Sequence, residues 1–226
     1  MGRNPQERRS IKIGWPIESG MVNPEFDDAA VTEVHFELQG VYLPRDHGYP
    51  LFLELSRLLP WLADETLAAV HPIHGAETGK DDLLILNRRA KLVMRIPTHR
   101  EADLAILSGQ TITVGGFKLT IGKGKAKPLA RYSPLYAHCV TTGSMDEEGF
   151  ASDIIRLLDE LKITCRFICG RRQTITTADG VAYGYSLLLH ELPVEHSILV
   201  QQRGMGCNRK IGCGIFIPHK STNALV

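Results

Sequence analysis

The sequence predicts an α+β fold built from two consecutive β-α-β-β-α-β units. Segments that alternate between apolar and polar residues, as half-buried strands do, are separated by segments with the apolar spacing of an amphipathic helix. The same pattern then occurs a second time after residue 128. This order of elements defines a ferredoxin-like unit. We therefore expect two such units in tandem, with a glycine-rich loop before the last strand.

The predicted elements of the first unit follow one another from residue 31. Residues 31–38 alternate, which predicts a half-buried strand. Leucines with offsets of 0, 4, 7, 8 and 11 from Leu51 predict a helix that begins near Pro50 and buries one face. Residues 71–75 have the composition of a turn. The remaining elements that we expect in this unit are strands at 83–86 and 91–96, a helix that opens at the capping box 98–101, and a hairpin at 112–121.

The second unit repeats this order after Pro128. Its first helix-spaced segment carries Phe150, Ile154 and Leu158 on one face. Asp179-Gly180, between two alternating runs, predicts a hairpin turn. The elements that we expect here are strands at 135–141, 166–168, 174–177, 181–190 and 214–218, and helices at 148–161 and 193–202.

We therefore divide the chain into residues 29–128 and 129–226, preceded by a polar leader at 1–28 without a sustained period. The 226 residues contain 43% apolar and 23% charged side chains, which is typical of a soluble globular protein. No apolar run approaches the roughly 18 residues of a membrane span, and no signal-peptide pattern opens the chain. The sequence predicts a cytoplasmic protein that does not contact a membrane.

Cysteine spacing gives no sign of a metal site. The chain has five cysteines, an odd number, and the pairs Cys165–Cys169 and Cys207–Cys213 lack the paired spacing of a zinc site. We expect reduced cysteines, no structural metal and no cofactor.

Positive charge is concentrated in two segments although the net charge is only +1. Residues 118–131 contain five cations and no acid. Residues 162–220 contain eight cations and three acids, a local net charge of +5. This asymmetry is typical of a protein that binds nucleic acid on one face, and the alternative is a set of ordinary solvated loops.

A glycine-rich loop at residues 204–218 precedes the last predicted strand. Four glycines and the adjacent cations Arg209 and Lys210 occupy eleven residues of it. Glycines can turn backbone N–H groups outward and let a phosphate approach closely. A dinucleotide fingerprint is excluded because a strand follows the loop instead of a helix, and residues 79–81 lack the hydroxyl of a Walker loop. The pattern predicts a phosphate-binding loop, and its alternative is a flexible hairpin turn.

This combination of tandem units and a terminal glycine-rich loop resembles the RAMP superfamily of CRISPR proteins. Within it, the sequence is similar to the Cas six family of repeat-processing endoribonucleases, above all its myxobacterial-type branch. The stretches that carry the resemblance are 43–51, 55–60, 70–73 and 204–218. The resemblance implies metal-independent cleavage of repeat RNA by the RNA's own 2′-hydroxyl. The implied products carry a 2′,3′-cyclic phosphate and a 5′-hydroxyl.

The resemblance also implies catalytic residues. His47 matches the family's histidine at the start of the first helix, where the helix dipole opposes imidazolium and favours a bound phosphate. Tyr42 matches a tyrosine that some members place shortly before the histidine. The lysine that those members use after the histidine is absent, so charge stabilisation falls to Arg45 or another cation. His71 and His74 are alternatives that we expect to be structural or peripheral.

RNA-binding residues are expected in the loop and in two basic hairpins. The resemblance implies RNA contacts of the loop, namely Gly204, Gly206, Asn208, Arg209, Lys210, Gly212 and Gly214. We expect the adjacent Arg203 to bind RNA as well. By composition, basic hairpins that track the phosphates of an RNA stem add Arg88, Arg89, Arg171 and Arg172.

The expected partner is CRISPR repeat RNA, as precursor and as mature guide, without direct contact to DNA. The alternatives are a catalytically silent RAMP subunit that holds guide RNA in an effector complex, and an RNA-binding protein unrelated to CRISPR. The sequence leaves open whether the chain docks on other subunits of an effector or transposition complex.

Overall fold

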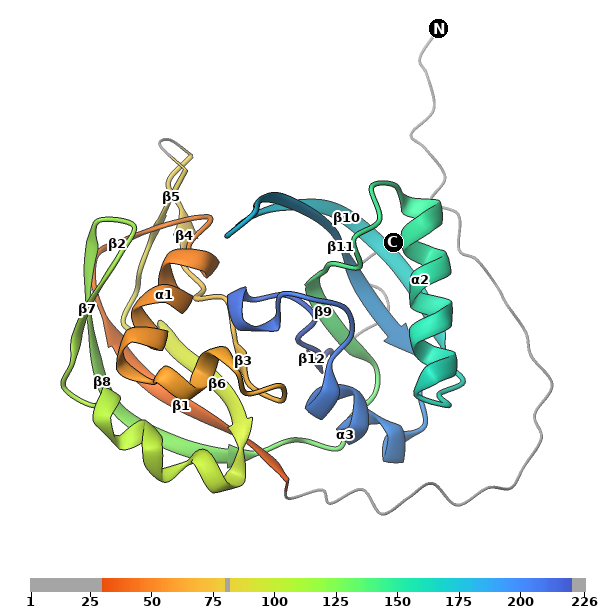
Figure 1. Ribbon diagram of the computed structural model, residues 1–226, viewed down its shortest axis with the longest axis horizontal. Helices are drawn as coiled ribbons and strands as arrows, with labels where there is room; N and C mark the ends of the chain where they lie inside the picture. Colours follow the sequence, from red (N-terminus) through yellow and green to blue (C-terminus); the bar gives the residue numbers. More distant parts are fainter. Residues whose placement is uncertain (1–29, 80–81, 221–226) are drawn as a thin grey trace, which may run out of the picture.

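The computed structural model describes residues 30–79 and 82–220 and consists of two sheet-based units that lie next to each other (Figure 1). Each unit combines an antiparallel sheet with helices on one of its faces. The predicted α+β fold of two tandem ferredoxin-like units is confirmed. The predicted leader at 1–28 lies outside the described residues.

In the first unit, five antiparallel strands have the order β3-β6-β1-β8-β7. Every second residue of β1, namely Val34, Phe36 and Leu38, is buried against the leucine face of helix α1. The alternation of apolar and polar residues in the sequence thus corresponds to a strand with one buried face. The bounds of these elements are β1 Val31–Gln39, α1 Gly48–Leu58, β3 Ala69–Val70, β6 Lys91–Pro97, β7 Thr111–Val114 and β8 Phe117–Pro128.

The strands expected at 83–86 and 91–96 are present as β5 and β6 (Lys91–Pro97), but they belong to different sheets. The partners of β6 are β1 and the two-residue strand β3, and Leu83–Ile85 forms β5 in a separate sheet of order β2-β5-β4. The other strands of that sheet are β2 (Tyr42–Pro44) and β4 (Ala76–Glu77). Both residues of β3 are buried, so the run has no alternation that a pattern could detect.

The predicted helix after the capping box is wrong. Residues 98–107 form two short 3₁₀ helices, η2 (Thr98–Arg100) and η3 (Ala102–Leu107), without a side-chain cap. The buried residues Leu104 and Leu107 are three apart, the spacing that places side chains on one line of a 3₁₀ helix. The predicted hairpin is confirmed: β7 and β8 are joined at Gly115 and Gly116, whose φ values of 56° and 87° suit a type I′ turn.

The second unit contains a sheet of order β10-β11-β9-β12. Two expected strands, at 166–168 and 174–177, are one strand, β10, with a bulge between Cys169 and Arg172. The last strand is shorter than expected. The bounds of these elements are β9 Leu135–Val140, α2 Glu147–Glu160, β10 Arg166–Thr177, β11 Gly180–His190, α3 Val194–Arg203, η4 Arg209–Ile211 and β12 Ile217–Pro218.

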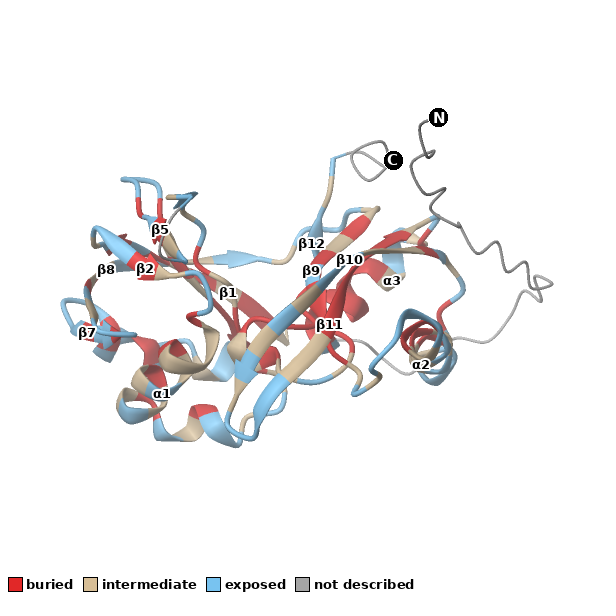
Figure 2. Cartoon of the chain, turned by 90° about the horizontal axis from the view of Figure 1, so that it is seen from above, coloured by how far each residue is buried: buried red, intermediate tan, exposed pale blue. Residues whose placement is uncertain are grey.

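The β10–β11 hairpin reaches from the second unit to the first. Seen from above, it extends toward helix α1 (Figure 2). Just before α1, the Asp46 carboxylate accepts a hydrogen bond of 2.8 Å from the backbone N–H of Thr176. The space between the two units is therefore bounded by the hairpin on one side.

A buried arginine joins the two units. Arg95 on β6 is fully buried and donates to the carbonyl oxygens of Gln201 (2.5 Å) and Phe216 (3.0 Å) in the second unit. The same guanidinium pairs with the Glu33 carboxylate on β1 at 2.5 Å. Because a buried cation needs partners on every side, this set of contacts fixes how the two sheets lie relative to each other.

Candidate active site

A cavity of about 340 Å³ lies where the two units meet. The first unit contributes residues 45–48 and 70–75, and the second contributes parts of β9, β10 and the glycine-rich loop. We call this cavity the histidine cleft, because four histidines line it: His47, His71, His74 and His138. Close contact between the units is possible here because position 48 is glycine: a Cβ there would lie 2.2 Å from the carbonyl oxygen of Ile211.

His47 occupies the N-cap position of α1 and is only 4% exposed. Its Nδ1 lies 2.9 Å from the carbonyl oxygen of Pro44 and 3.1 Å from that of Arg45. Its Nε2 accepts a hydrogen bond of 2.9 Å from the backbone N–H of Ile73. Because an N–H must donate to Nε2, the ring is neutral with its proton on Nδ1.

Burial lowers the pKa of His47, although the hydrogen bonds to the carbonyl groups of Pro44 and Arg45 counteract this change. The imidazole is therefore in the neutral form that a general base needs. However, both of its nitrogens are engaged within the protein. In this geometry, His47 positions the segment that contains Ile73 and has no free lone pair to accept a further proton.

His71 belongs to the ion cluster between the units. Its Nε2 lies 3.3 Å from Oε1 of Glu33, the carboxylate that also pairs with Arg95. Burial lowers the pKa of His71, and its contact with Glu33 opposes that change. Burial raises the pKa of Glu33, but its contacts with His71 and Arg95 outweigh burial and hold this pKa well below its usual range. The Nε2 atom of His71 is therefore directed toward Glu33 in the ion cluster that joins the units.

His74 and His138 are the exposed histidines of the cleft. His74 follows Ile73 in the first unit, and His138 lies on β9 of the second unit between two buried residues. Burial lowers the pKa of His138, and the charge of His74 lowers it further. Sequence reasoning missed His138. The sequence indicated only that His138 is a polar residue between apolar neighbours in the predicted strand 135–141, which places its side chain on the outer face of that strand.

The predicted residues near His47 have different surroundings. Arg45 lines the histidine cleft and forms an exposed ion pair with Glu77. Tyr42 is not among the residues that line the cleft, and its ring packs at 6.3 Å from that of Phe117 in an edge-on arrangement. The structure therefore brings Arg45, but not Tyr42, to the cavity that contains His47.

The predicted basic hairpins are also separated. Arg171 lines the histidine cleft. Arg172 points elsewhere: its guanidinium lies 4.2 Å from the centroid of the Tyr183 ring and donates to the carbonyl oxygen of Met145. Arg88 and Arg89 lie in the exposed turn between β5 and β6 and line neither this cleft nor the neighbouring pocket.

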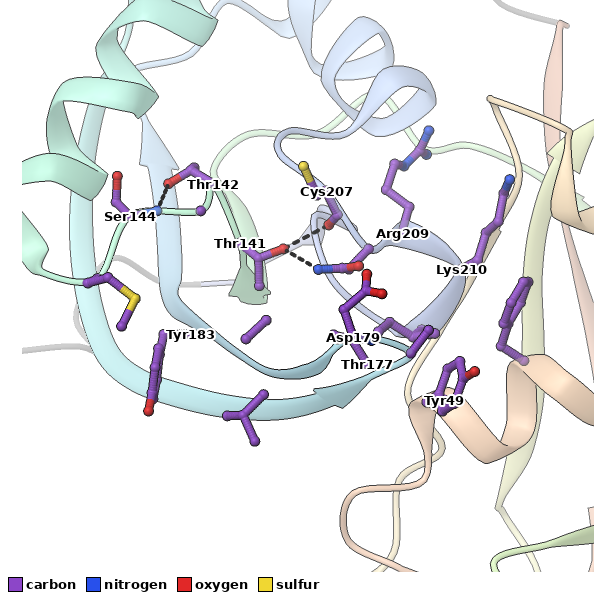
Figure 3. A pocket seen from close by; sticks show the side chains of 18 of the residues that line it. Tyr49, Thr141, Thr142, Ser144, Thr177, Asp179, Tyr183, Cys207, Arg209 and Lys210 are labelled. Atoms are coloured by element: carbon purple, nitrogen blue, oxygen red, sulfur yellow. Dashed lines mark hydrogen bonds between the residues drawn. The ribbon is translucent and has the colours of Figure 1, made fainter.

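That neighbouring pocket has a volume of about 740 Å³ and shares Ile211 with the histidine cleft. We call it the hairpin pocket (Figure 3), because the tip of the β10–β11 hairpin forms one wall and residues 207–211 form another. Tyr49 and Phe52 of α1 contribute aromatic rings to it. The Thr141 side chain, shown with its hydrogen bonds to Cys207 and Asn208, holds the loop against the second unit.

The glycine-rich loop is packed tightly on the strand β9 and its continuation. Its backbone N–H groups were expected to face outward, but those of Cys207 and Gly214 donate to the carbonyl groups of Thr141 and Cys139. A Cβ at Gly206 would lie 2.2 Å from the Thr141 carbonyl oxygen. These glycines therefore permit close backbone packing.

The predicted loop cations contact the protein as well. Arg209 is only 9% exposed and donates to the carbonyl oxygen of Gln202 at 2.8 Å. Burial and the charge of Arg95 lower the pKa of Arg209 to about 10. Lys210 donates to the carbonyl oxygen of Ala63 in the first unit. Arg203, at the end of α3, is exposed.

Within residues 30–79 and 82–220, no group of three or more His, Cys, Asp or Glu side chains is arranged to hold a metal ion. Helices in the same part of the chain are too short or too polar to cross a membrane.

Comparisons with known proteins assign the chain to a family. Residues 32–221 match the sequence model of the family described as Cas6 Crispr. The chain is 34% identical over 184 residues to the CRISPR-associated endonuclease Cas6 of Myxococcus xanthus, covering 81% of this chain and 79% of that protein.

Solved structures show the same fold at low identity. A CRISPR associated protein Cas6 superposes with a TM-score of 0.64 at 11% identity, covering 84% of this chain and all of the other. The product of a Cas6-related gene from Pyrococcus furiosus gives 0.61 at 11% identity, covering 82% and 97% of the two chains. The predicted resemblance to a myxobacterial relative is confirmed. The chain belongs to the Cas6 family of CRISPR-associated endonucleases.

Proposed function

We propose that this chain cuts CRISPR precursor RNA within its repeats, in the histidine cleft, and so releases guide RNAs. The 2′-hydroxyl before the cut attacks the adjacent phosphate, which gives a 2′,3′-cyclic phosphate and a 5′-hydroxyl without a metal ion. Family membership supports processing of CRISPR RNA by an endonuclease. The observation that carries the mechanism is a cleft between the two units that combines four imidazoles with cations.

The cleft contains the groups that this reaction needs. An attacking 2′-hydroxyl needs a base, the departing 5′-oxygen needs an acid, and the pentacoordinate phosphorus needs positive charge. Imidazoles serve the first two needs near neutral pH. Arg45 and Arg171 enter the cleft from different units and serve the third. The ion pair of Arg45 with Glu77 is exposed, so exchanging Glu77 for a phosphate costs little.

The RNA on either side of the cut has surfaces available in both units. The hairpin pocket adjoins the cleft and offers the rings of Tyr49 and Phe52 to an unpaired base. Lys210 lines this pocket and provides charge for phosphate groups, and Arg172 stacked on Tyr183 provides a platform on the hairpin. The two units, residues 29–128 and 129–226, therefore bind the repeat together.

A second candidate function is a silent subunit that binds guide RNA without cutting it. One observation favours it: both ring nitrogens of His47 are already engaged within the protein. The two functions differ in a direct experiment, in which the purified chain is mixed with repeat RNA of the neighbouring CRISPR array in excess EDTA. A single cut with a cyclic phosphate end supports the proposed nuclease. Tight binding without a cut supports the silent subunit.

A further inference from the structure

The β10–β11 hairpin crosses from the second unit toward the first and borders both cavities (Figure 2). Residues 171 and 173–175 of β10 line the histidine cleft, whereas residues 177–179 and 181–183 line the hairpin pocket. Thr176 lies between these two stretches. The place of the hairpin therefore sets the shape of both cavities to which the proposed function assigns the RNA.

A hydrogen bond attaches this point of the hairpin to the first unit. The backbone N–H of Thr176 donates to the Asp46 carboxylate at 2.8 Å, although the two residues are 130 positions apart in the sequence. β10 is the edge strand in the order β10-β11-β9-β12, so N–H groups on its outer side point away from the neighbouring strand β11. Asp46 supplies an acceptor for one of them from the segment just before His47 and α1.

The base of the hairpin is attached to the second unit instead. β10 has a bulge between Cys169 and Arg172, and bulges bend a strand. At this bulge the backbone N–H of Arg171 donates to the hydroxyl of the buried Ser186 at 2.9 Å. The hairpin is thus held at its base by its own unit and farther out by Asp46 of the other unit.

The charge of Asp46 is unfavourable for binding RNA. Its carboxylate lines the histidine cleft, where it repels the phosphate groups that the proposed function brings there. The N–H of Thr176 is neutral and does not cancel this charge. A carboxylate at this position therefore weakens the affinity for RNA, and its contact with the hairpin gives it a different role.

We propose that the hydrogen bond between Asp46 and Thr176 is a latch that holds the β10–β11 hairpin in place beside the histidine cleft during RNA cleavage. Asp46 is then a positioning residue, which acts through the hairpin and not on the reacting atoms. This inference rests on the proposed function and adds a positioning residue to it.

The latch links the two segments that carry the arginines of the cleft. Arg45 precedes Asp46, and Arg171 lies on the same strand as Thr176. Both guanidinium groups have to reach one phosphate group, so the distance between their segments matters for charge stabilisation. Misplacing a group by about 1 Å can slow a reaction by about 10²-fold. Because Asp46 and Thr176 are exposed and water competes for both groups, we expect a smaller loss, of about tenfold.

The experiment measures single-turnover cleavage of repeat RNA from the neighbouring array by the full chain, in excess EDTA and over a range of protein concentrations. Each series gives the rate at saturating protein and the protein concentration at half of that rate. Asp46→Ala removes the acceptor, and Thr176→Pro removes the donor on an edge strand, where proline is tolerated. We expect each variant to lower the saturating rate by about tenfold. The half-saturating concentration should fall for Asp46→Ala, because the repelling charge is gone, and stay close to the wild-type value for Thr176→Pro.

Further variants separate the latch from other causes. Asp46→Asn keeps an acceptor without the charge, so it should restore most of the rate that Asp46→Ala loses. Thr176→Ala keeps the N–H and removes a side chain that lines neither cavity, so this matched control should cut at the wild-type rate. Asp46→Ala combined with Thr176→Pro should be no slower than either single variant, since both remove the same hydrogen bond. Hydrogen exchange of the Thr176 amide, measured by NMR, should be faster in Asp46→Ala than in wild type.

Wild-type saturating rates of both Asp46→Ala and Thr176→Pro overturn the inference. It is also overturned if Asp46→Asn is as slow as Asp46→Ala while Thr176→Pro cuts normally, because the charge beside His47 and not the hydrogen bond then accounts for the loss. A combined variant that multiplies the two single losses overturns it as well. In all three cases the wild-type chain cuts, so the proposed function stands. A wild-type chain that binds RNA without cutting it overturns the proposed function and this inference with it.

Discussion

Arg95 holds the two units together, and its removal gives the largest loss of stability that we predict. The change is Arg95→Met, which keeps an unbranched, largely apolar side chain and removes the guanidinium charge. The guanidinium is fully buried and contacts the Glu33 carboxylate and two carbonyl groups of the second unit. Breaking a buried ion pair by removing one partner costs about 3–5 kcal/mol, because the other charge loses its compensation; here, among the described residues, Glu33 keeps only histidine partners, His35 and His71. The exposed fraction of the Glu33 side chain is 17%, so water relieves little of this cost.

We therefore expect the free energy of unfolding to fall by about 4 kcal/mol, measured by urea titration with a spectroscopic readout. Glu33→Gln combined with Arg95→Met should recover about 1 kcal/mol or more, because it removes the unpaired charge. A loss below about 1 kcal/mol for Arg95→Met would refute the reasoning that Arg95 joins the units.

Three further predictions concern the loop, the buried histidines and the cleft. Gly206→Ala should lower the free energy of unfolding by about 3 kcal/mol or more in urea titrations. The control Gly143→Ala, also at positive φ but with open space around it, should lower it by about 1–2 kcal/mol. Equal losses would refute the close packing of the loop. Burial lowers the pKa values of His47 and His71 from 6.5, so only the unfolded chain gains their protons just below pH 6.5. The free energy of unfolding should thus fall as pH drops below 6.5, by at most about 1.4 kcal/mol per pH unit for each histidine. His47→Gln should reduce this slope, and an unchanged slope would contradict the prediction. Arg171→Ala should weaken binding of repeat RNA and lower the slope of log affinity against log salt by about 1, and an unchanged slope would remove Arg171 from the interface.

Local patterns predicted the order of elements, because their signal lies in neighbouring residues. The hairpin at Gly115-Gly116 follows from two glycines between alternating runs, and both adopt positive φ. In contrast, β3 is a buried pair of residues whose pairing with β6 depends on tertiary contacts. The capping box at 98–101 was present in the sequence, but the apolar spacing after it fits a 3₁₀ helix.

The candidate site was predictable in position and not in its contacts. The sequence indicated His47 at the start of a helix, and the structure has it at the N-cap. The hydrogen bond from Ile73 joins residues 26 apart and has no local signal. His138 comes into the cleft only because the second unit packs against the first. The composition of the sequence identified the glycine-rich loop as a special segment. The structure shows that its glycines permit close backbone packing, which composition does not reveal.

The central claim is metal-free cleavage by the RNA's own 2′-hydroxyl. The most direct measurement compares repeat RNA with the same RNA that carries a single 2′-deoxy nucleotide before the cut, both with wild-type protein in excess EDTA. We predict one cut with a cyclic phosphate end in the first RNA, and binding without a cut in the second. Cleavage of the 2′-deoxy RNA at the same position, or cleavage of the unmodified RNA only after a divalent metal is added, would contradict the account.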